Sequence, residues 1–213
     1  MRRAIRDDQK ELRRQTILDM AWSLFQIQPY EAINMQEVAV QSGLAKGTLY
    51  LYFQTKEELF LAVLEQQFDG WMNEIDNTLS TLSRSTEAEV VVEAFSHSLA
   101  SHPALLRLLA MSHSILEQNV NPDVVGRFKQ ATLTHLGKTG LILEQLLPQL
   151  QAGDGALFLL YGNALIVGLY GMANPTASAA KALTSHPALA PLQLDFTYHF
   201  QASMLALLRG WSP

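Results

Sequence analysis

The stretch of residues 34–56, NMQEVAVQSGLAKGTLYLYFQTK, predicts a helix, a tight turn, a second short helix and the start of a third. Counted from Met35, position 5 is the small Ala39, position 9 is Gly43 and position 15 is the apolar Leu49. A small residue lets another helix pass close by, a glycine makes the turn with positive φ at little cost, and an apolar residue covers the shared core. These are the positions that a helix-turn-helix requires, so the stretch predicts a DNA-binding unit.

The second helix of this unit leaves four residues outside the predicted core, namely Lys46, Gly47, Thr48 and Tyr50. Glycine lets the backbone approach a phosphate, and the hydroxyls of Thr48 and Tyr50 suit base edges in a DNA groove. The helix N-terminus also attracts phosphate. Of the two tyrosines Tyr50 and Tyr52, we expect one to lie in the core, and we expect Tyr50 to point outward.

The composition indicates extensive burial. Charged residues make up 16% of the 213 residues and apolar residues 48%, against about a quarter charged in an average domain, so we expect burial between subunits as well as within one. Cysteine is absent, which excludes disulfides, thiolate metal ligands and a cysteine nucleophile. The basic N-terminus is interrupted by Asp7, Asp8 and Glu11, and no apolar run follows it. No signal peptide is therefore predicted, and the cytoplasm is the expected location.

The net charge of −5 is unevenly distributed along the chain. Residues 1–60 hold eight Lys and Arg against eight Asp and Glu, and residues 61–213 hold seven against twelve. Six basic residues lie within the first fourteen positions: Arg2, Arg3, Arg6, Lys10, Arg13 and Arg14. Taken alone, this segment would be a frayed, solvated arm. Because phosphate binding requires only a local basic patch, we interpret it beside the helix-turn-helix as an arm that contacts phosphate.

Apolar periodicity predicts helices along the chain and therefore an all-α protein. The first amphipathic stripe precedes Pro29 and consists of Ile17, Leu18, Ala21, Leu24 and Phe25. No segment alternates polar and apolar residues with the period of two that a strand requires. We expect an N-terminal three-helix helix-turn-helix domain over residues 1–60 and a larger C-terminal helical bundle over residues 61–213.

Two pairs of residues have the spacing of a capping box and mark predicted helix starts. Asn34 precedes Glu37 by three residues, and Thr55 precedes Glu58 by the same interval. From Thr55 the sequence predicts one long helix that runs to about Leu82.

Residues 156–173, ALFLLYGNALIVGLYGMA, carry no charge and are long enough to cross a membrane. Asn163 lies near the centre, three glycines interrupt the run, and no Lys or Arg lies at either edge. In a soluble protein, a helix that is apolar on all sides is buried on all sides. Ala164 and Gly168 have the small-xxx-small spacing that lets another helix approach, so we interpret the segment as a core or dimer helix.

The sequence contains no recognisable catalytic motif. The run GKTG at residues 137–140 lacks the upstream glycine of a phosphate-binding loop, where Thr132 stands, and the preceding residues are predicted to be helical. No two of the six histidines are spaced four residues apart. A zinc site assembled from distant helices remains an alternative to ordinary hydrogen-bonded histidines. We predict no enzymatic activity, no cofactor and no metal.

The run at residues 14–59, RQTILDMAWSLFQIQPYEAINMQEVAVQSGLAKGTLYLYFQTKEEL, resembles the DNA-binding domain of TetR-family transcriptional regulators. The string GTLYLYFQTKEEL is its most specific part. The family usually has Gly where Pro29 stands and Thr or Ser where Asn34 stands, so the loop before the second helix must differ here. Ala45 replaces a common Ser or Thr, which removes one potential hydrogen bond at the start of the recognition helix.

The resemblance implies a homodimer that binds double-stranded DNA through its N-terminal domain and a small-molecule effector through its C-terminal domain. Tyr52 matches a backbone-contacting aromatic residue of the family, and Lys56 matches a phosphate-binding lysine at a helix start. Carried over by position, the residues expected to contact DNA are Asn34, Met35, Ala45, Lys46, Gly47, Thr48, Tyr50, Tyr52 and Lys56.

Two further sets of residues are expected in the C-terminal domain. The candidates for an effector pocket are bulky and helix-borne: Trp71, Phe95, Leu99, Met111, Phe128, Tyr161 and Tyr170. The candidates for the dimer interface are Ala164, Gly168, Leu169, Met204 and Leu208. An apolar effector is expected, because few basic residues of this domain have interior positions.

Together these features predict a ligand-responsive repressor that binds a palindromic operator as a dimer and is released by the effector. The long helix from Thr55 would be the lever between the domains, and Gly70 could relax it midway. Two alternatives remain open. The C-terminal domain could serve only for dimerisation or for binding a protein partner, or residues 156–173 could anchor the chain to a membrane.

Overall fold

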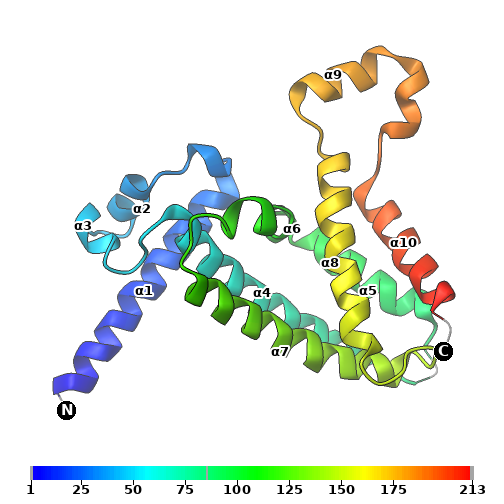
Figure 1. The fold of residues 1–213 in the computed structure, drawn as a ribbon, viewed down its shortest axis with the longest axis horizontal. Helices are drawn as coiled ribbons and strands as arrows, with labels where there is room; N and C mark the ends of the chain where they lie inside the picture. Colours follow the sequence, from blue (N-terminus) through cyan, green and yellow to red (C-terminus); the bar gives the residue numbers. More distant parts are fainter. Residues whose placement is uncertain (1, 85, 212–213) are drawn as a thin grey trace. The chain divides into compact units, whose positions relative to one another are not determined.

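The computed structural model describes the backbone of residues 2–84 and 86–211, with side chains from residue 8 onward within those ranges. Over the described residues the chain forms helices and no strand, which confirms the all-α prediction (Figure 1). The chain divides into two compact units. One contains residues 1–67 and 112–129, and the other contains residues 68–111 and 130–213. In this division, residues 112–129 belong with the N-terminal part of the chain.

The first unit contains the helix-turn-helix. Its helices are α1 (Arg2–Ile27), the short 3₁₀ turn η1 (Tyr30–Ala32), α2 (Met35–Gln41), α3 (Lys46–Leu49), the start of α4 (Lys56–Ser80), the π-helical turn η2 (Ser112–Leu116) and the start of α7 (Pro122–Leu146). Aromatic side chains hold its core together. The ring centroids of Phe25 and Phe60 lie 5.6 Å apart, and those of Tyr30 and Phe60 lie 5.2 Å apart.

Both predicted helix starts are confirmed, and each N-cap side chain makes its expected hydrogen bond. The Asn34 side chain accepts a hydrogen bond of 3.0 Å from the backbone N–H of Glu37, and the Thr55 hydroxyl accepts one of 3.0 Å from that of Glu58. Between α2 and α3 the backbone turns at Gly43 with φ +67°, a conformation that residues with a Cβ rarely adopt. These local contacts fix where each short helix begins and ends.

The second unit is a bundle of longer helices. It contains the rest of α4 and α7 together with α5 (Ala88–Ser101), α6 (Pro103–Ala110), α8 (Asp154–Ala173), α9 (Ala177–Ser185), the 3₁₀ turn η3 (Pro187–Leu192) and α10 (Phe196–Gly210). α10 packs against α5 and α8, and α6 packs against α8. α8 and α10 are antiparallel, because Trp211 at the end of α10 lies with its ring centroid 6.1 Å from that of Phe158 near the start of α8.

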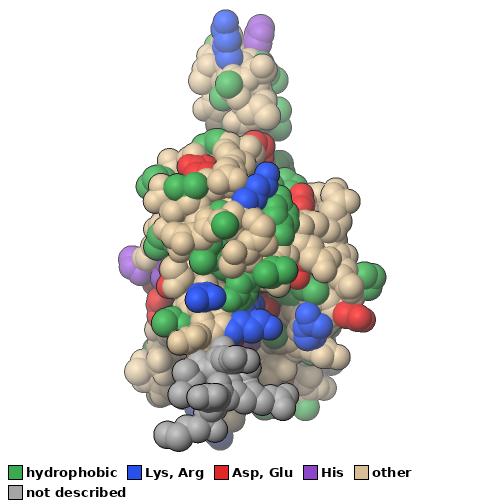
Figure 2. Space-filling model, turned by 90° about the vertical axis from the view of Figure 1, so that its left-hand side faces the viewer, with side chains coloured by type: hydrophobic (Ala, Val, Ile, Leu, Met, Phe, Trp, Pro, Cys, Tyr) green, Lys and Arg blue, Asp and Glu red, His purple; other side chains and the backbone are tan. Residues whose placement is uncertain are grey.

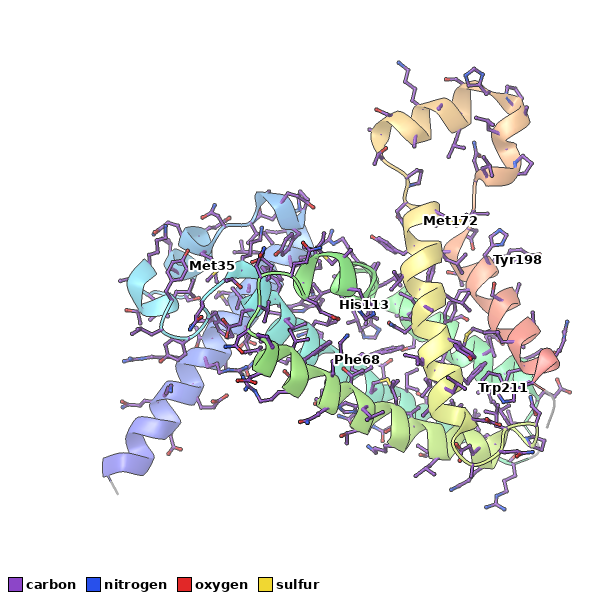
Figure 3. All side chains as sticks on the ribbon, viewed as in Figure 1. Met35, Phe68, His113, Met172, Tyr198 and Trp211 are labelled. Atoms are coloured by element: carbon purple, nitrogen blue, oxygen red, sulfur yellow. The ribbon has the colours of Figure 1, made fainter. Side chains whose placement is uncertain are left out.

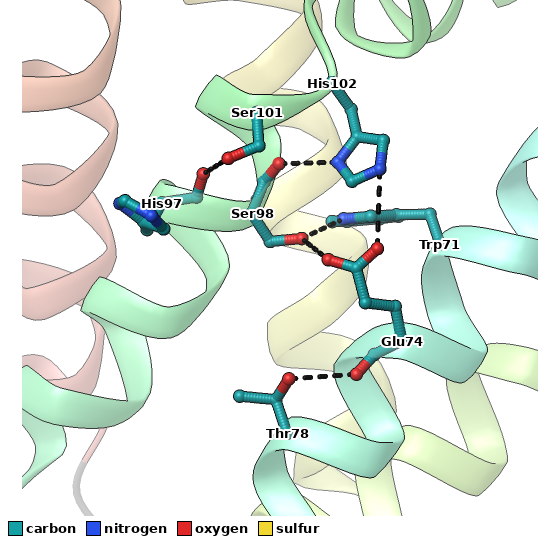
Figure 4. Close-up of polar contacts among 7 residues, drawn as sticks. All are labelled: Trp71, Glu74, Thr78, His97, Ser98, Ser101 and His102. Carbon is teal, nitrogen blue, oxygen red and sulfur yellow. Dashed lines mark hydrogen bonds and ion pairs between the residues drawn. The ribbon is translucent and has the colours of Figure 1, made fainter.

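Polar contacts tie α4 to its neighbours in this unit. Ser98 of α5 accepts a hydrogen bond of 3.0 Å from the indole N–H of Trp71 and donates one of 2.9 Å to Glu74 (Figure 4). On another side of α4, the buried Asp76 accepts a 2.6 Å hydrogen bond from the Thr139 hydroxyl and pairs with the Lys138 ammonium at 2.8 Å. A buried carboxylate is tolerated only when it is paired in this way.

α7 and α8 approach each other closely enough for their backbones to touch at two glycines. A Cβ built on Gly140 would lie 2.5 Å from the backbone nitrogen of Ala156, and a Cβ on Gly155 would overlap the carbonyl oxygen of Gly140. Residues 137–140 lie inside α7, and the preceding residues are helical as predicted. Gly140 serves helix packing.

α8 is only partly buried within one subunit, where its buried residues are Gly155, Phe158, Leu159, Gly162 and Ile166. The sequence predicted a core or dimer helix, and that role stays a prediction. By length and composition α8 could cross a membrane. Only 22% of its most apolar stretch is buried within the subunit. One face of this charge-poor helix is thus left uncovered by the subunit itself.

Substituting alanine at either glycine of the α7–α8 crossing should destabilise the fold. We expect Gly140→Ala and Gly155→Ala to lower the free energy of unfolding by about 3 kcal/mol or more, because the added methyl meets backbone atoms that cannot rotate away. Gly137→Ala in the same helix is the matched control, because its Cβ meets nothing within 4 Å. That variant should be neutral or up to about 1 kcal/mol more stable. Urea unfolding followed by circular dichroism measures all three, and equal stabilities would contradict the crossing.

Candidate nucleic-acid interface

The second helix of the helix-turn-helix presents one buried and one exposed side. Leu49 is fully buried and Phe53 is 3% exposed, so they anchor the helix to the core of the first unit. Lys46 and Gly47 are exposed, and Tyr50 is 40% exposed. Tyr52 is half-buried, so Tyr50 is the more exposed of the two tyrosines.

The exposed side combines charge, hydroxyls and an aromatic surface. The Lys46 ammonium lies 6.0 Å from the centroid of the Tyr50 ring, a cation–π arrangement that holds both side chains on the same surface. Half-buried Thr48 lies between them in sequence. This arrangement offers an ammonium to a phosphate and hydroxyls to base edges.

Leu51 is a candidate contact that the sequence analysis missed. It is 82% exposed, directly after Tyr50 and beyond the end of α3. Its apolar side chain gave no sign of exposure, because Leu49, two positions earlier, is a core residue. The spacing could have indicated the exposure of Leu51. Leu49 and Phe53 are four residues apart and both buried, and Leu51 lies midway between them in sequence. An exposed apolar side chain here suits the methyl group of thymine.

Three predicted contacts lie at the starts of α2 and α3. Asn34 is exposed, but its side-chain oxygen already caps α2. Met35 is 7% exposed, so its side chain belongs to the core of the first unit. Ala45 is exposed and makes no side-chain capping hydrogen bond at α3, in line with the expected loss of one hydrogen bond. Only its backbone is available to a phosphate.

Lys56 is held by contacts within the first unit. Its ammonium lies 3.8 Å from the centroid of the Tyr30 ring and donates a hydrogen bond to the Tyr30 carbonyl oxygen. Burial lowers the pKa of Lys56, and the carboxylates of Glu31 and Glu57 oppose that shift. Burial likewise raises the pKa of the Tyr30 hydroxyl, with smaller contributions from Glu57 and Glu31. An ammonium carries three donors, so Lys56 can brace this corner and still offer an N–H to a phosphate.

The basic N-terminal segment belongs to α1. Lys10 and Arg13 are exposed, while Arg14 pairs with Glu11 at 3.8 Å and lies 5.6 Å from the Phe53 ring centroid. The side chains of Arg2, Arg3 and Arg6 lie outside those that the structure describes. The face of the molecule in Figure 2 shows Lys and Arg side chains beside hydrophobic ones. Such a surface suits a polyanion with apolar groups in its groove.

The predicted pocket residues belong to both units. Trp71, Phe95 and Leu99 are buried in the α4–α5 part of the second unit, with the rings of Trp71 and Phe95 6.4 Å apart. Met111 is half-buried in the same unit, and Phe128 is buried in the first unit. The other two lie on α8.

On α8, the two tyrosines have different surroundings. Tyr161 is 42% exposed and, with Ala206, Leu207, Gly210 and Trp211, lines a shallow open depression of about 400 Å³. Tyr170 is half-buried, and burial raises the pKa of its hydroxyl, an effect that the nearby positive charge of Arg107 on α6 opposes.

The predicted interface residues fall on two sides of the α8–α10 pair. Ala164 and Gly168 are exposed, and Leu169 is half-buried. Met204 and Leu208 are 2% and 3% exposed, because they face the inside of the subunit. A Cβ on Gly162 would lie 3.1 Å from the Met204 methyl. Other residues of α10 are therefore available to a partner.

The short turn at Gly43, the buried side of α3 and its exposed polar side define a helix-turn-helix protein. Two family models match the chain. The one described as "Bacterial regulatory proteins, tetR family" matches residues 17–63, and the one described as "Tetracyclin repressor-like, C-terminal domain" matches residues 65–213. The chain belongs to the TetR family of transcriptional regulators, and the resemblance seen in the sequence is confirmed.

Similar proteins include transcriptional regulators, two of which have structures in complex with an acyl-CoA. The chain is 30% identical over 124 residues to the transcriptional activator FasR of Mycolicibacterium smegmatis, over 58% of this chain and 55% of that protein. It therefore spans about half the length of this relative. The fold is similar to that of Thermus thermophilus FadR in complex with lauroyl-CoA (TM-score 0.59, 18% identity, 92% of each chain). It is also similar to that of Bacillus subtilis FadR in complex with stearoyl-CoA (TM-score 0.54, 17% identity, 91% of this chain and 96% of that one).

Lys46 and Leu51 should affect DNA binding in different ways. Lys46→Ala should weaken binding to all sequences alike and reduce the salt slope by about 1, because one phosphate contact is lost. Leu51→Ala should relax preference at one base pair by about 1 kcal/mol with little change in salt slope. Selection from random duplexes, followed by fluorescence anisotropy, measures both effects.

The exposed Gln26 of α1 supplies the control for these variants. Gln26→Ala should leave both the affinity and the sequence preference unchanged. A Leu51→Ala protein that selects the same sequence as the parent, with the same discrimination, would remove Leu51 from the interface.

Proposed function

We propose that this regulator binds a palindromic operator as a homodimer, represses from it, and is released by an amphiphilic effector with an acyl chain. The observation that carries the proposal is a pair of uncovered apolar faces on α8 and α10 in a chain that also holds a helix-turn-helix. A dimer places two recognition surfaces in the two-fold arrangement that a palindrome requires.

The proposed dimer face is made by exposed residues of α8 and α10. On α8 they recur at helical spacing and form one stripe: Leu157, Leu160, Tyr161, Ala164, Gly168, Gly171 and Met172. On α10 the exposed residues of one stripe are Tyr198, Ala202, Ala206 and Gly210. Neither stripe contains a charged residue, and each includes small residues that permit close helix approach. Large uncharged faces of this kind mark protein interfaces.

Two recognition helices about 34–36 Å apart would reach successive major grooves of B-DNA. Effector binding would favour a dimer geometry with a different spacing, so release is a shift between two populations. α4 is the element available to couple the two processes, because it begins in the first unit and continues in the second. Gly70, near the point of change, is exposed and its Cβ would meet nothing within 4 Å, so packing does not require a glycine there.

The proposed effector class rests on the similar folds that hold lauroyl-CoA and stearoyl-CoA. An acyl chain agrees with the apolar effector expected from the sequence. The half-buried pair Arg107 and Tyr170 adds a cation and a hydroxyl in the second unit, which an acyl thioester or carboxylate could use. The similar proteins differ in how they regulate. FasR is a transcriptional activator, and Thermus thermophilus FadR, which has the acyl-CoA ligand that guides the proposed effector, is a transcriptional repressor. The proposal therefore follows the repressor.

A charge placed on the α8 stripe should separate the subunits without unfolding them. Gly168→Arg is accommodated in one subunit, because a Cβ at Gly168 meets nothing within 4 Å. In a dimer it would bury an unpaired cation, so we expect the dimer dissociation constant to rise about 100-fold or more. Analytical ultracentrifugation over a concentration series measures this change, and operator affinity should fall with it.

Gly126→Arg on α7 is the matched control, because Gly126 is also exposed with open space around its Cβ. It should leave the subunit association unchanged. A Gly168→Arg protein that associates as tightly as the parent would show that α8 does not form the interface.

The effector should release DNA and stabilise the fold. We expect lauroyl-CoA or stearoyl-CoA, and neither free CoA nor glycerol, to dissociate a fluorescent operator duplex in an anisotropy titration. A ligand at 100 times its dissociation constant should add about 2.7 kcal/mol to the stability by mass action, which a thermal-shift measurement detects. If operator binding is tight and no acyl compound changes it, the second unit serves dimerisation or a protein partner.

A further inference from the structure

The side chain of Glu37 on α2 is bonded to the end of α1. Its carboxylate oxygen Oε1 accepts a hydrogen bond of 3.0 Å from the side-chain amide of Gln28, nine residues earlier in the sequence. Gln28 directly follows the last residue of α1, and its backbone N–H donates to the carbonyl oxygen of Leu24 at 3.1 Å. The Gln28–Glu37 bond is therefore a side-chain tether between the end of α1 and the first turn of α2.

The starts of α2 and α4 differ in where the glutamate at the third helical position goes. At α4, the Glu58 carboxylate turns back past its own helix start and accepts a hydrogen bond of 2.7 Å from the backbone N–H of Gln54. At α2, Glu37 accepts from Gln28 of the neighbouring helix. A capping box uses this side chain for the start of its own helix, so at α2 the same side chain serves a contact between helices.

The tether lies in a partly buried and stiff part of the chain. Gln28 and Glu37 are both half-buried, and a hydrogen bond to an ionised acceptor is stronger than one between neutral groups. Pro29 follows Gln28 with φ −68° and ψ 150°, and a proline restricts the residue before it to extended conformations. Because the backbone at Gln28 is already restricted, the bond orders little additional chain.

The position of α2 affects the position of the recognition helix α3. α2 packs against both α1 and α3, and it begins at Met35, which is labelled in Figure 3 and is 7% exposed. α3 has only four residues, and so short a helix is not stable without packing. Its orientation therefore comes from α2 and from its own buried Leu49. A shift of α2 on α1 would move the exposed side of α3.

We propose that Gln28 is a positioning residue for DNA recognition, which fixes α2 on α1 through Glu37 and thereby the placement of α3 on the base edges. This inference rests on the helix-turn-helix alone, and on neither the homodimer nor the effector proposed above. Specific contacts require placement to within about 0.5 Å, whereas non-specific binding requires only phosphate neutralisation. Loss of the tether should therefore reduce sequence discrimination more than it reduces DNA binding as such.

The test measures the binding of full-length variants to two fluorescent duplexes by anisotropy. One duplex has the sequence that the parent protein selects from random duplexes, and the other has that sequence scrambled. In Gln28→Ala, we expect the discrimination between the two to fall about tenfold, the size of one lost base contact. Affinity for the scrambled duplex should change by less than about twofold and its salt slope should stay the same, because no phosphate contact is removed.

Gln15→Ala is the matched control, because the Gln15 amide donates a hydrogen bond of 2.7 Å to Asp19 within α1 itself. This variant should leave both affinities unchanged. Glu37→Gln is the conservative variant, since an amide oxygen can still accept from Gln28, and it should keep the discrimination of the parent. Glu37→Ala should lower the discrimination as Gln28→Ala does, and the double alanine variant should lose no more than either single one.

Four results would overturn the proposal. Gln28→Ala could keep the discrimination of the parent, which would remove the positioning role. Both affinities could fall by the same factor together with the helical signal in circular dichroism, which would assign Gln28 to folding alone. Glu37→Ala could bind both duplexes more tightly, which would show that Glu37 acts by its charge. A parent protein that selects no sequence would overturn recognition itself, and this role of Gln28 with it.

Hydrogen exchange measures the hold on α2 in the absence of DNA. We expect the amides of residues 38–41 to exchange about fivefold faster in Gln28→Ala than in the parent, because α2 then opens locally from α1 more often. Gln15→Ala should leave these rates unchanged. Equal rates in Gln28→Ala and the parent would show that the tether does not hold α2.

Discussion

The arrangement of the second unit depends on the backbone contact between Gly140 of α7 and Gly155 of α8. Because neither glycine has a side chain, α8 reaches α7 at a distance that any other residue would prevent. α6 and α10 pack against α8, so the position of α8 sets theirs as well. These neighbours cover only part of α8, so the side chains on its remaining face stay exposed within the subunit.

The sequence was sufficient for local structure and insufficient for burial between helices. The caps at Asn34 and Thr55 and the turn at Gly43 involve residues a few positions apart, and their spacing alone predicts them. Whether Met204 faces α8 or a partner depends on the rotation of α10 about its axis, which no local pattern determines. The same limit applies to α8, whose charge-free sequence predicted a core or dimer helix without indicating which face the subunit itself covers.

The recognition surface, too, could be predicted only in part from the sequence. Leu49 was identified as core because its apolar character agrees with its position, whereas Leu51 was missed because its apolar character does not reveal its exposure. Lys56 matches a phosphate-binding position of the family, but the structure adds its contacts with Tyr30. The ammonium that the family resemblance assigns to phosphate is therefore also one that stabilises this corner of the first unit.

The order of residues along the chain has a consequence for synthesis. The first unit is complete at residue 129, whereas the uncovered faces of α8 and α10 lie after it, between residues 154 and 210. At about 5–20 residues per second, the interval from one to the other is on the order of ten seconds. A nascent chain thus carries its recognition helix well before the proposed dimer face has been synthesised, so subunits can pair through that face only after most of the chain is complete.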